Sequence, residues 1–315
     1  MAVSEKSAIF ATEISEKMWI QSFIDYLRFE KNYSERTITV YQADLEAFRQ
    51  FYETLDKELN WNNLDKDVVR QWVVSMMEHG NIASSVNRRL SALRSFYKFL
   101  LQRKLVEYDP AHMVTGPKKD KPLPSYLRES EMNRLLDDVQ FGDSYAGKRD
   151  YMILLMFYST GIRVSELTNL SVADVDLSQK QLKVTGKRNK QRVIPFGKEM
   201  EMRLKEYLIA RQTWLDSRGM PSKTLFLDER TCQQMTPNKV GSRVKHYLSM
   251  VTTQKKRSPH VLRHTFATSM LNHYADLQSV KELLGHERLS TTEIYTHTSF
   301  EELKELYNKA HPRAK

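Results

Sequence analysis

The stretch LSTTEIYTH, residues 289–297, contains a tyrosine whose position is closely defined by its neighbours. Ser290 and Glu293 have the S-x-x-E spacing of a capping box, which predicts the start of a helix and places Tyr295 within about two turns of that start. A half-buried tyrosine with a hydrogen-bonded hydroxyl is the common case. Tyrosine can also act as a nucleophile, but its phenol is weak at neutral pH and needs charged groups nearby.

The segment SPHVLRHTFATSML, residues 258–271, supplies two such groups. Ser258 as a cap, followed by proline, predicts the start of a helix. His260 and Arg263 are three residues apart and share a face near that start, where anions are favoured. His264 gives the i, i+4 spacing of a zinc pair, but H-E-x-x-H lacks its glutamate here and no Cys or carboxylate cluster completes a site. We therefore expect no metal and no cofactor.

Two more cations occur at predicted turns. Arg163 follows the helix-ending Gly161 and stands between apolar residues, so it is expected to be partly buried. A buried arginine needs an anionic partner, which is either Glu166 or a substrate phosphate. The segment TGKRNKQ places Lys187 at the tip of a predicted hairpin, from which it can reach into a groove.

A second histidine, His286, directly follows Gly285, a typical residue at the end of a helix, and precedes Tyr295 by nine residues. The candidate site therefore combines three fixed cations, two imidazoles and one phenol: Arg163, Lys187, His260, Arg263, His286 and Tyr295. This set fits a phosphodiester substrate. The cations would neutralise charge on the phosphate oxygens, the phenol would attack phosphorus, and a lysine or histidine would protonate the leaving oxygen.

The elements that position these residues fall into two predicted domains. Residues 1–113 show helical periodicity and predict a helical bundle. One helix is expected over 35–55 with Ser34 as its N-cap, a second after Leu64, and a third over 85–104. The apolar face of the third consists of Val86, Leu90, Leu93, Tyr97 and Leu100. Residues 114–126 contain prolines, a glycine and lysines and predict a linker. Residues 127–315 mix long helices with a short antiparallel hairpin, so the predicted fold is mainly α with a small antiparallel β-sheet.

One face of the predicted helix at 85–104 carries donors and cations without an acid: Asn87, Ser91, Arg94 and Lys98. Such stripes are usually solvated surface. The absence of compensating carboxylates favours contacts with phosphates.

The bulk properties agree with a polyanionic partner. The 315 residues carry a formal net charge of +10, which often accompanies nucleic-acid binding. The single cysteine, Cys232, lies in a polar stretch and excludes an intrachain disulfide, as is typical of a reducing cytosol. No apolar run approaches the ~18 residues that span a membrane, and the N-terminus lacks the apolar core of a signal peptide. We expect a cytoplasmic protein that associates with the nucleoid.

Four segments, TGIRVSEL, GKRNKQRVIP, SPHVLRHTFAT and LLGHERLSTTEIYTH, resemble in order and spacing the catalytic boxes of the tyrosine recombinase (integrase) family. FIDYLRFEKNYSERTITVYQADLEAF and RRLSALRSFYKFL resemble its Xer branch. The resemblance covers nearly the whole chain. It implies an N-terminal helical core-binding (SAM-like) domain and a C-terminal α+β catalytic domain.

The resemblance also implies a role for each candidate. Arg163 and Arg263 would clamp the scissile phosphate, and Lys187 would protonate the 5′-hydroxyl leaving group. His260 and His286 would support the phosphorane and the proton transfers, and Tyr295 would form a 3′-phosphotyrosine. Relatives often have glycine where Arg188 stands, so Lys190 is the alternative acid, and both residues are candidates for DNA contact.

The family acts as four protomers on paired half-sites of duplex DNA and exchanges strands through a Holliday junction. This implies a homo- or heterotetramer, the latter with a second Xer-type recombinase. The amphipathic segment SFEELKELYNKAHP would dock on a neighbouring protomer, with packing on its own domain as the alternative. The implied role is chromosome dimer resolution. The alternatives are the integrase or invertase of a mobile element, a type IB topoisomerase-like enzyme, and a catalytically silent DNA-binding protein.

Overall fold

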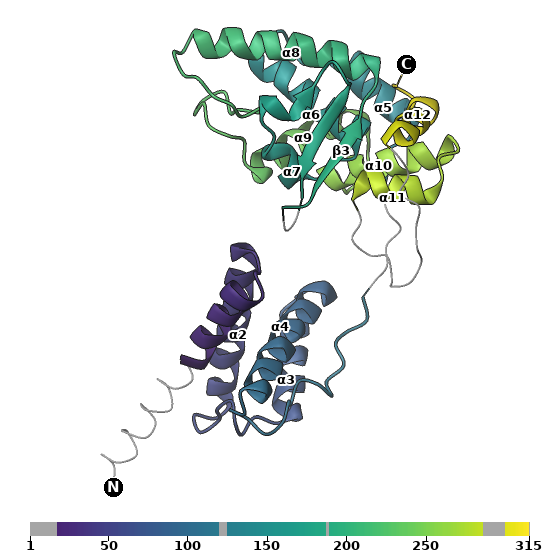
Figure 1. Cartoon of the computed structure of the whole chain (residues 1–315). Coiled ribbons are helices and arrows are strands. Elements are labelled where there is room, and N and C mark those ends of the chain that lie inside the picture. The colour runs from purple at the N-terminus through teal and green to yellow at the C-terminus, as the bar shows by residue number, and fades with distance from the viewer. Residues whose placement is uncertain (1–17, 120–124, 187–188, 286–299, 315) are drawn as a thin grey trace. The chain divides into compact units, whose positions relative to one another are not determined.

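The computed structural model describes residues 18–119, 125–186, 189–285 and 300–314. The chain divides into two units, Met1–Pro122 and Leu123–Lys315, whose helices and strands are drawn in Figure 1. Each unit has its own hydrophobic core. The division falls inside the proline-containing segment 114–126.

The first unit is helical. Residues 18–25 are helical and continue into η1 (Tyr26–Glu30), and three longer helices follow: α2 (Glu35–Leu55), α3 (Lys66–Glu78) and α4 (Ala83–Gln102). The predicted N-cap of α2 is confirmed, because the Ser34 side chain accepts a hydrogen bond from the Thr37 backbone at 3.3 Å. The predicted apolar face of α4 is also confirmed, with these residues buried: Val86, Leu90, Leu93, Tyr97 and Leu100.

The second unit surrounds one buried helix, α6 (Tyr145–Thr160), which is covered by α8 (Lys198–Asp216), α9 (Pro237–Val251) and α10 (Pro259–Asn272). Its small sheet has the order β1 (Val175–Asp176), β2 (Gln181–Thr185), β3 (Gln191–Pro195), and all pairs are antiparallel. The shorter elements are α5 (Glu129–Asn133), η2 (Arg134–Asp138), α7 (Val164–Thr168), η3 (Val172–Asp174) and α11 (Leu277–Leu284). The mixed composition predicted for this half of the chain is confirmed.

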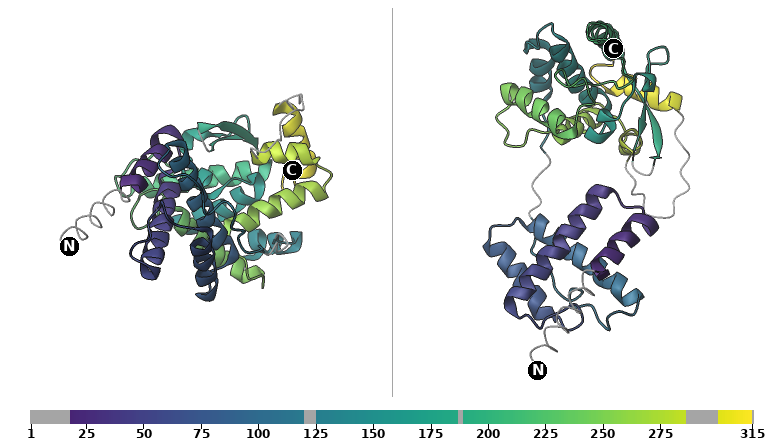
Figure 2. Two further views of the ribbon diagram at one scale, coloured as in Figure 1. Left: turned by 90° about the horizontal axis from the view of Figure 1, so that it is seen from below. Right: turned by 90° about the vertical axis from the view of Figure 1, so that its left-hand side faces the viewer.

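The last helix, α12 (Phe300–Ala310), packs against α10 and β3 of its own unit; it is yellow in Figures 1 and 2. The Tyr307 side chain is fully buried, and His311 stacks on it with ring centroids 5.0 Å apart. Burial lowers the pKa of His311 to about 4, so the ring is neutral at pH 7. The Arg313 backbone donates to Nδ1 of His311, so Nε2 carries the proton and donates to the Tyr158 carbonyl at 3.1 Å. Within this single chain, α12 therefore packs in cis.

None of the helices in the described ranges has the length and apolar character needed to cross a bilayer.

Candidate active site and DNA-binding residues

Gly161 ends α6 as predicted and turns the chain toward Arg163. Its φ of +58° lies in the left-handed region, which glycine adopts most easily. A Cβ at this position would lie 2.4 Å from Phe266 Cδ1 and 2.7 Å from Leu284 Cδ2. Only a glycine therefore allows α6 to end this close to α10 and α11.

Arg163 is half-buried and paired with Glu166. Its Nη1 donates to Glu166 Oε1 at 2.7 Å, and its backbone N–H donates to Oε2 at 2.9 Å. The sequence analysis considered two anionic partners for Arg163, Glu166 and a substrate phosphate, and the structure shows Arg163 bound to Glu166. The pair leaves the Arg163 side chain 36% exposed, whereas that of Glu166 is 2% exposed.

A further arginine, Arg192 on β3, shares this carboxylate. Its Nη1 and Nη2 donate to Oε1 and Oε2 of Glu166, each at 2.9 Å. This is the parallel fork by which arginine binds a carboxylate most strongly. Burial opposes ionisation of Glu166, but the hydrogen bonds and charge of Arg192 and the hydrogen bonds of Arg163 outweigh it and lower the pKa of Glu166 to about 2.

The C-terminal end of α11 is held by three arginines. The last carbonyls of a helix have no partner within the helix. Here each of three consecutive carbonyls accepts from a different guanidinium: Leu283 from Arg192 Nε at 2.9 Å, Leu284 from Arg263 Nη2 at 2.7 Å, and Gly285 from Arg163 Nη2 at 2.8 Å. Gly285 has the predicted left-handed conformation, with φ +65°. The chain continues directly from this glycine to His286.

Arg263 lies on α10 and is buried, and it also donates to the carbonyl of Gly161. Burial, followed by the like charges of Arg163 and Arg192, lowers its pKa to about 10. It therefore remains protonated at neutral pH. Arg163 and Arg192 bind the one carboxylate, Glu166, and the charges of Arg163, Arg192 and Glu166 all act on Arg263. This cluster of three arginines and one carboxylate therefore has an excess of positive charge that an anion would balance.

The start of α10 differs from the prediction in one respect. Proline occupies the first turn as expected, but Ser258 makes no capping hydrogen bond with its side chain. His260 is exposed, whereas Arg263 on the same helix is buried. Burial, then His260 and Arg263, lower the pKa of His264. In the described part of the chain, no group of three or more His, Cys, Asp or Glu residues is arranged to hold a metal ion.

Four predicted site residues, Lys187, Arg188, His286 and Tyr295, lie outside the described residues, as does the proposed capping box. Lys190 is described and exposed, and its carbonyl accepts from Gly186 at 2.7 Å across the hairpin. The structure thus brings Arg163 and Arg263 together at the end of α11, in the direct sequence neighbourhood of His286.

The predicted phosphate-binding stripe on α4 is partly used within the protein itself. Asn87 Nδ2 donates to the Pro117 carbonyl at 2.8 Å, and Arg94 donates to the carbonyls of Ala111 and Val114. These bonds hold residues 111–117 on α4, so part of the predicted linker belongs to the first unit. Within the stripe, Ser91 and Lys98 are exposed.

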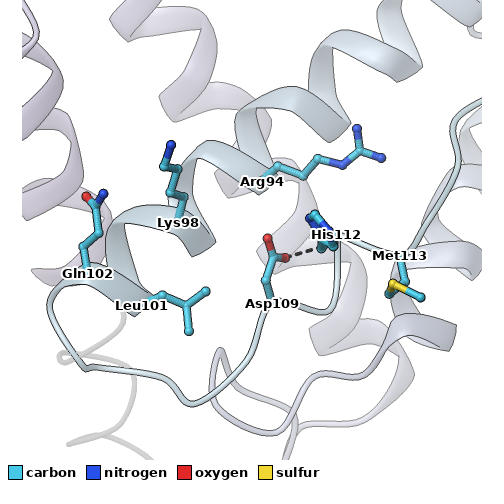
Figure 3. Close-up of a pocket in the computed structure, with 7 residues that line it drawn as sticks. All are labelled: Arg94, Lys98, Leu101, Gln102, Asp109, His112 and Met113. Carbon is cyan, nitrogen blue, oxygen red and sulfur yellow. Dashed lines mark hydrogen bonds between the residues drawn. The ribbon is translucent and has the colours of Figure 1, made fainter.

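A cavity of about 660 Å³ lies beside this stripe (Figure 3). Arg94 and Lys98 lie on one side of it, and Asp109 and His112 lie on the other. Asp109 Oδ1 accepts from the backbone of Ala111 and His112, and burial raises the pKa of this carboxyl. An acid within the cavity makes it a poor phosphate site, which leaves Lys98 as the stronger candidate for a DNA contact.

Arg192 is the residue that the sequence analysis missed. The position of Arg192 in its strand could have identified it. Arg192 is two residues from the buried Ile194 on β3 and pairs with the buried Val184 of β2, so it occupies an inward-facing position of the strand. A cation at such a position requires a buried anion, and Glu166 provides it.

Both units of the chain match known protein families. Residues 125–302 match the model of the phage integrase family, and residues 20–104 match its N-terminal SAM-like domain. The chain is 36% identical to tyrosine recombinase XerC of Chlorobaculum tepidum, with 96% of each chain covered. It is 38% identical to tyrosine recombinase XerC of Bacillus subtilis, with 95% of this chain and 97% of the relative covered.

Among solved structures, XerH site-specific recombinase bound to a palindromic difH substrate gives a TM-score of 0.69 at 20% identity, covering 90% of this chain and 78% of that one. The Tn1549 transposon integrase in complex with transposon right end DNA gives 0.67 at 18% identity, covering 91% and 97%. At these identities the likeness concerns the fold alone.

The fold and the family match together place the chain in the phage integrase family. It is a tyrosine-type site-specific DNA recombinase of the Xer kind. The predicted fold class, with a helical SAM-like N-terminal domain and a mixed catalytic domain, is confirmed.

Proposed function

We propose that Tyr295 is the nucleophile of a metal-independent strand exchange on duplex DNA. Its phenol oxygen attacks the scissile phosphorus, the P–O bond to the 5′ oxygen breaks, and a 3′-phosphotyrosine forms. Lys187, or Lys190 if the hairpin places it closer, protonates the departing 5′ oxygen. Attack by a 5′-hydroxyl on the phosphotyrosine reverses the step, so the phosphodiester energy is conserved.

The observation that carries this proposal is the arginine cluster at the end of α11. Arg163 and Arg263 both donate to α11 carbonyls, Arg163 to Gly285 and Arg263 to Leu284. A scissile phosphate would compete for these donors, because charge-assisted hydrogen bonds to phosphate are stronger than those to neutral carbonyls. His260 on α10 and His286 after α11 would assist the proton transfers.

We propose further that the enzyme works as a tetramer on paired half-sites and passes through a Holliday junction. The similarity to Xer recombinases supports a housekeeping role in chromosome dimer resolution, in the cytoplasm and at the nucleoid, alone or with a second Xer-type recombinase. Lys98 and Ser91 of α4, together with Arg188 and Lys190 of the hairpin, would contact DNA phosphates.

The variant Tyr295→Phe tests the nucleophile. On a nicked suicide substrate the wild-type protein should become covalently attached to DNA, whereas the variant should bind the site equally well and form no adduct. An adduct formed by the variant would assign the nucleophile to another residue.

Lys187→Ala tests the general acid. Sulfur leaves without a proton, so a 5′-bridging phosphorothiolate should restore cleavage to this variant. Rescue of Lys190→Ala instead would assign the acid to Lys190.

A further inference from the structure

Arg192 contacts the active-site region through its whole guanidinium group. Its Nη1 and Nη2 donate to Glu166, and its Nε donates to the carbonyl of Leu283, all at 2.9 Å. All three guanidinium nitrogens are therefore engaged. Its side chain is 16% exposed, against 36% for Arg163.

These contacts connect three elements. Arg192 lies on β3, Glu166 lies on α7, and Leu283 belongs to the last turn of α11. Glu166 in turn binds Arg163 through both its backbone and its side chain. Displacement of Arg192 would therefore remove one of the three guanidiniums that hold the end of α11. It would also remove one of the two cations that bind Glu166, the carboxylate that orients Arg163.

The side-chain stem of Arg192 also packs on the glycine at the end of α11. A Cβ added to Gly285 would lie 3.2 Å from Arg192 Cδ and 3.2 Å from its Nη1. Arg192 therefore both binds the Leu283 carbonyl in the last turn of α11 and packs closely against Gly285, the residue that ends this helix.

We propose that Arg192 is a positioning residue for strand cleavage: it fixes the end of α11, from which His286 follows, and orients Arg163 through Glu166. The inference rests on the proposed roles of Arg163 and His286. A lysine cannot replace it, because a single ammonium does not reproduce the fork to both Glu166 oxygens together with the bond to Leu283.

The test uses Arg192→Lys in the full-length protein, with Arg211→Lys as the matched control. Arg211 is also buried and donates to backbone carbonyls, those of Ser222, Thr224 and Leu225, but none of these belongs to the arginine cluster.

Three quantities are measured: the melting temperature, half-site binding, and the rate of single-turnover cleavage of a nicked substrate. Arg192→Lys should bind half-sites normally and cleave on the order of 10- to 100-fold more slowly, the cost of a small misplacement of reacting groups. Arg211→Lys should lower only the melting temperature.

A second substrate distinguishes positioning from a general loss of structure. A methylphosphonate at the scissile position replaces one charged non-bridging oxygen by a neutral methyl group, so less charge remains for Arg163 and Arg263 to stabilise. The Arg192→Lys defect should then shrink, because the misplaced guanidiniums contribute less to this reaction. Equal defects on both substrates, or normal cleavage of the phosphate substrate, would overturn the inference.

Glu166→Gln provides an independent check if Arg192→Lys does not fold. This variant keeps the side-chain shape and removes the shared charge, and it should show the same substrate-dependent loss. If both variants fold, the double variant should cleave DNA little more slowly than either single variant, because both substitutions break the same contact between Arg192 and Glu166. Fully additive losses of cleavage rate would contradict this contact's role. Tyr295→Phe is run in parallel: an adduct in that variant refutes the proposed function, whereas normal cleavage by Arg192→Lys refutes only the role of Arg192.

Discussion

The Nη1 atoms of Arg163 and Arg192 lie 2.7 and 2.9 Å from the same oxygen, Oε1 of Glu166. Two guanidiniums approach each other this closely only because an ionised carboxylate lies between them. The arrangement keeps Arg163 oriented before DNA arrives. It also makes the ionisation of Glu166 a condition for the geometry of the cluster.

The shared carboxylate gives a prediction about acid stability. The pKa of Glu166 falls from its ordinary 4.5 to about 2, so its contribution is complete above pH 4.5 and is lost as the pH falls through about 2. Over that interval the wild-type protein should lose on the order of 3 kcal/mol of unfolding free energy more than Glu166→Gln does. Urea unfolding of both proteins at several pH values measures the difference. Parallel pH curves would show that Glu166 is not selectively stabilised as an anion.

Gly161→Ala should be much more costly than an ordinary glycine substitution. The left-handed φ costs about 1–2 kcal/mol with any L side chain, and the contacts at 2.4 and 2.7 Å add about 1–3 kcal/mol of overpacking. Gly219→Ala is the matched control, because Gly219 has φ +62° and no atom within 4 Å of an added Cβ. Thermal unfolding compares them. Equal losses would mean that α10 and α11 move apart freely around position 161.

Arg94 and Lys98 should separate into a structural and a DNA-binding residue. Arg94→Ala removes the bonds to Ala111 and Val114 and should lower the melting temperature. Lys98→Ala should leave the melting temperature unchanged and reduce the log–log salt slope of DNA binding by about one, for one lost phosphate contact. The opposite pattern would transfer the phosphate contact to Arg94.

Removal of residues 300–315 should destabilise the second unit rather than only prevent assembly. The deletion uncovers the core beneath Tyr307 and His311, and loss of a large buried aromatic alone costs about 3–5 kcal/mol. The double variant Glu305→Ala, Lys309→Ala changes only exposed positions of α12 and serves as the control. Urea unfolding and half-site gel shifts follow both proteins. A truncated protein with wild-type stability would show that α12 contributes nothing to its own domain.

Local rules predicted much of the fold. Ser34 caps α2, Gly161 and Gly285 end α6 and α11, and the apolar faces of the first-unit helices are buried, because these features depend on residues close in sequence. The absent Ser258 cap shows the limit of the rule: the residue occupies the N-cap position, but its side chain makes no capping bond.

The contacts that organise the site could not be obtained in this way. Arg163 was expected to have one anionic partner, and the structure adds a second cation from β3 to the same carboxylate. Asn87 and Arg94 appeared free to contact phosphates because their acceptors, backbone carbonyls at positions 111–117, carry no sequence signal. Every residue has a carbonyl, so only the folded chain shows which carbonyls are left without a helical partner.

The capping of α11 has a consequence for the order of folding. A helix of eight residues is too short to persist alone, since isolated helices below about 12–15 residues are marginal in water. Two of its terminal hydrogen bonds come from residues 122 and 91 positions earlier in the chain, so they form only after large loops have closed. We therefore expect α11 to dock among the last elements of its domain and to exchange its amide hydrogens among the first. The contacts of Arg163 and Arg192 with the end of α11 form only at that step, so we expect chains in which α11 has not yet docked to bind a phosphate and cleave DNA poorly.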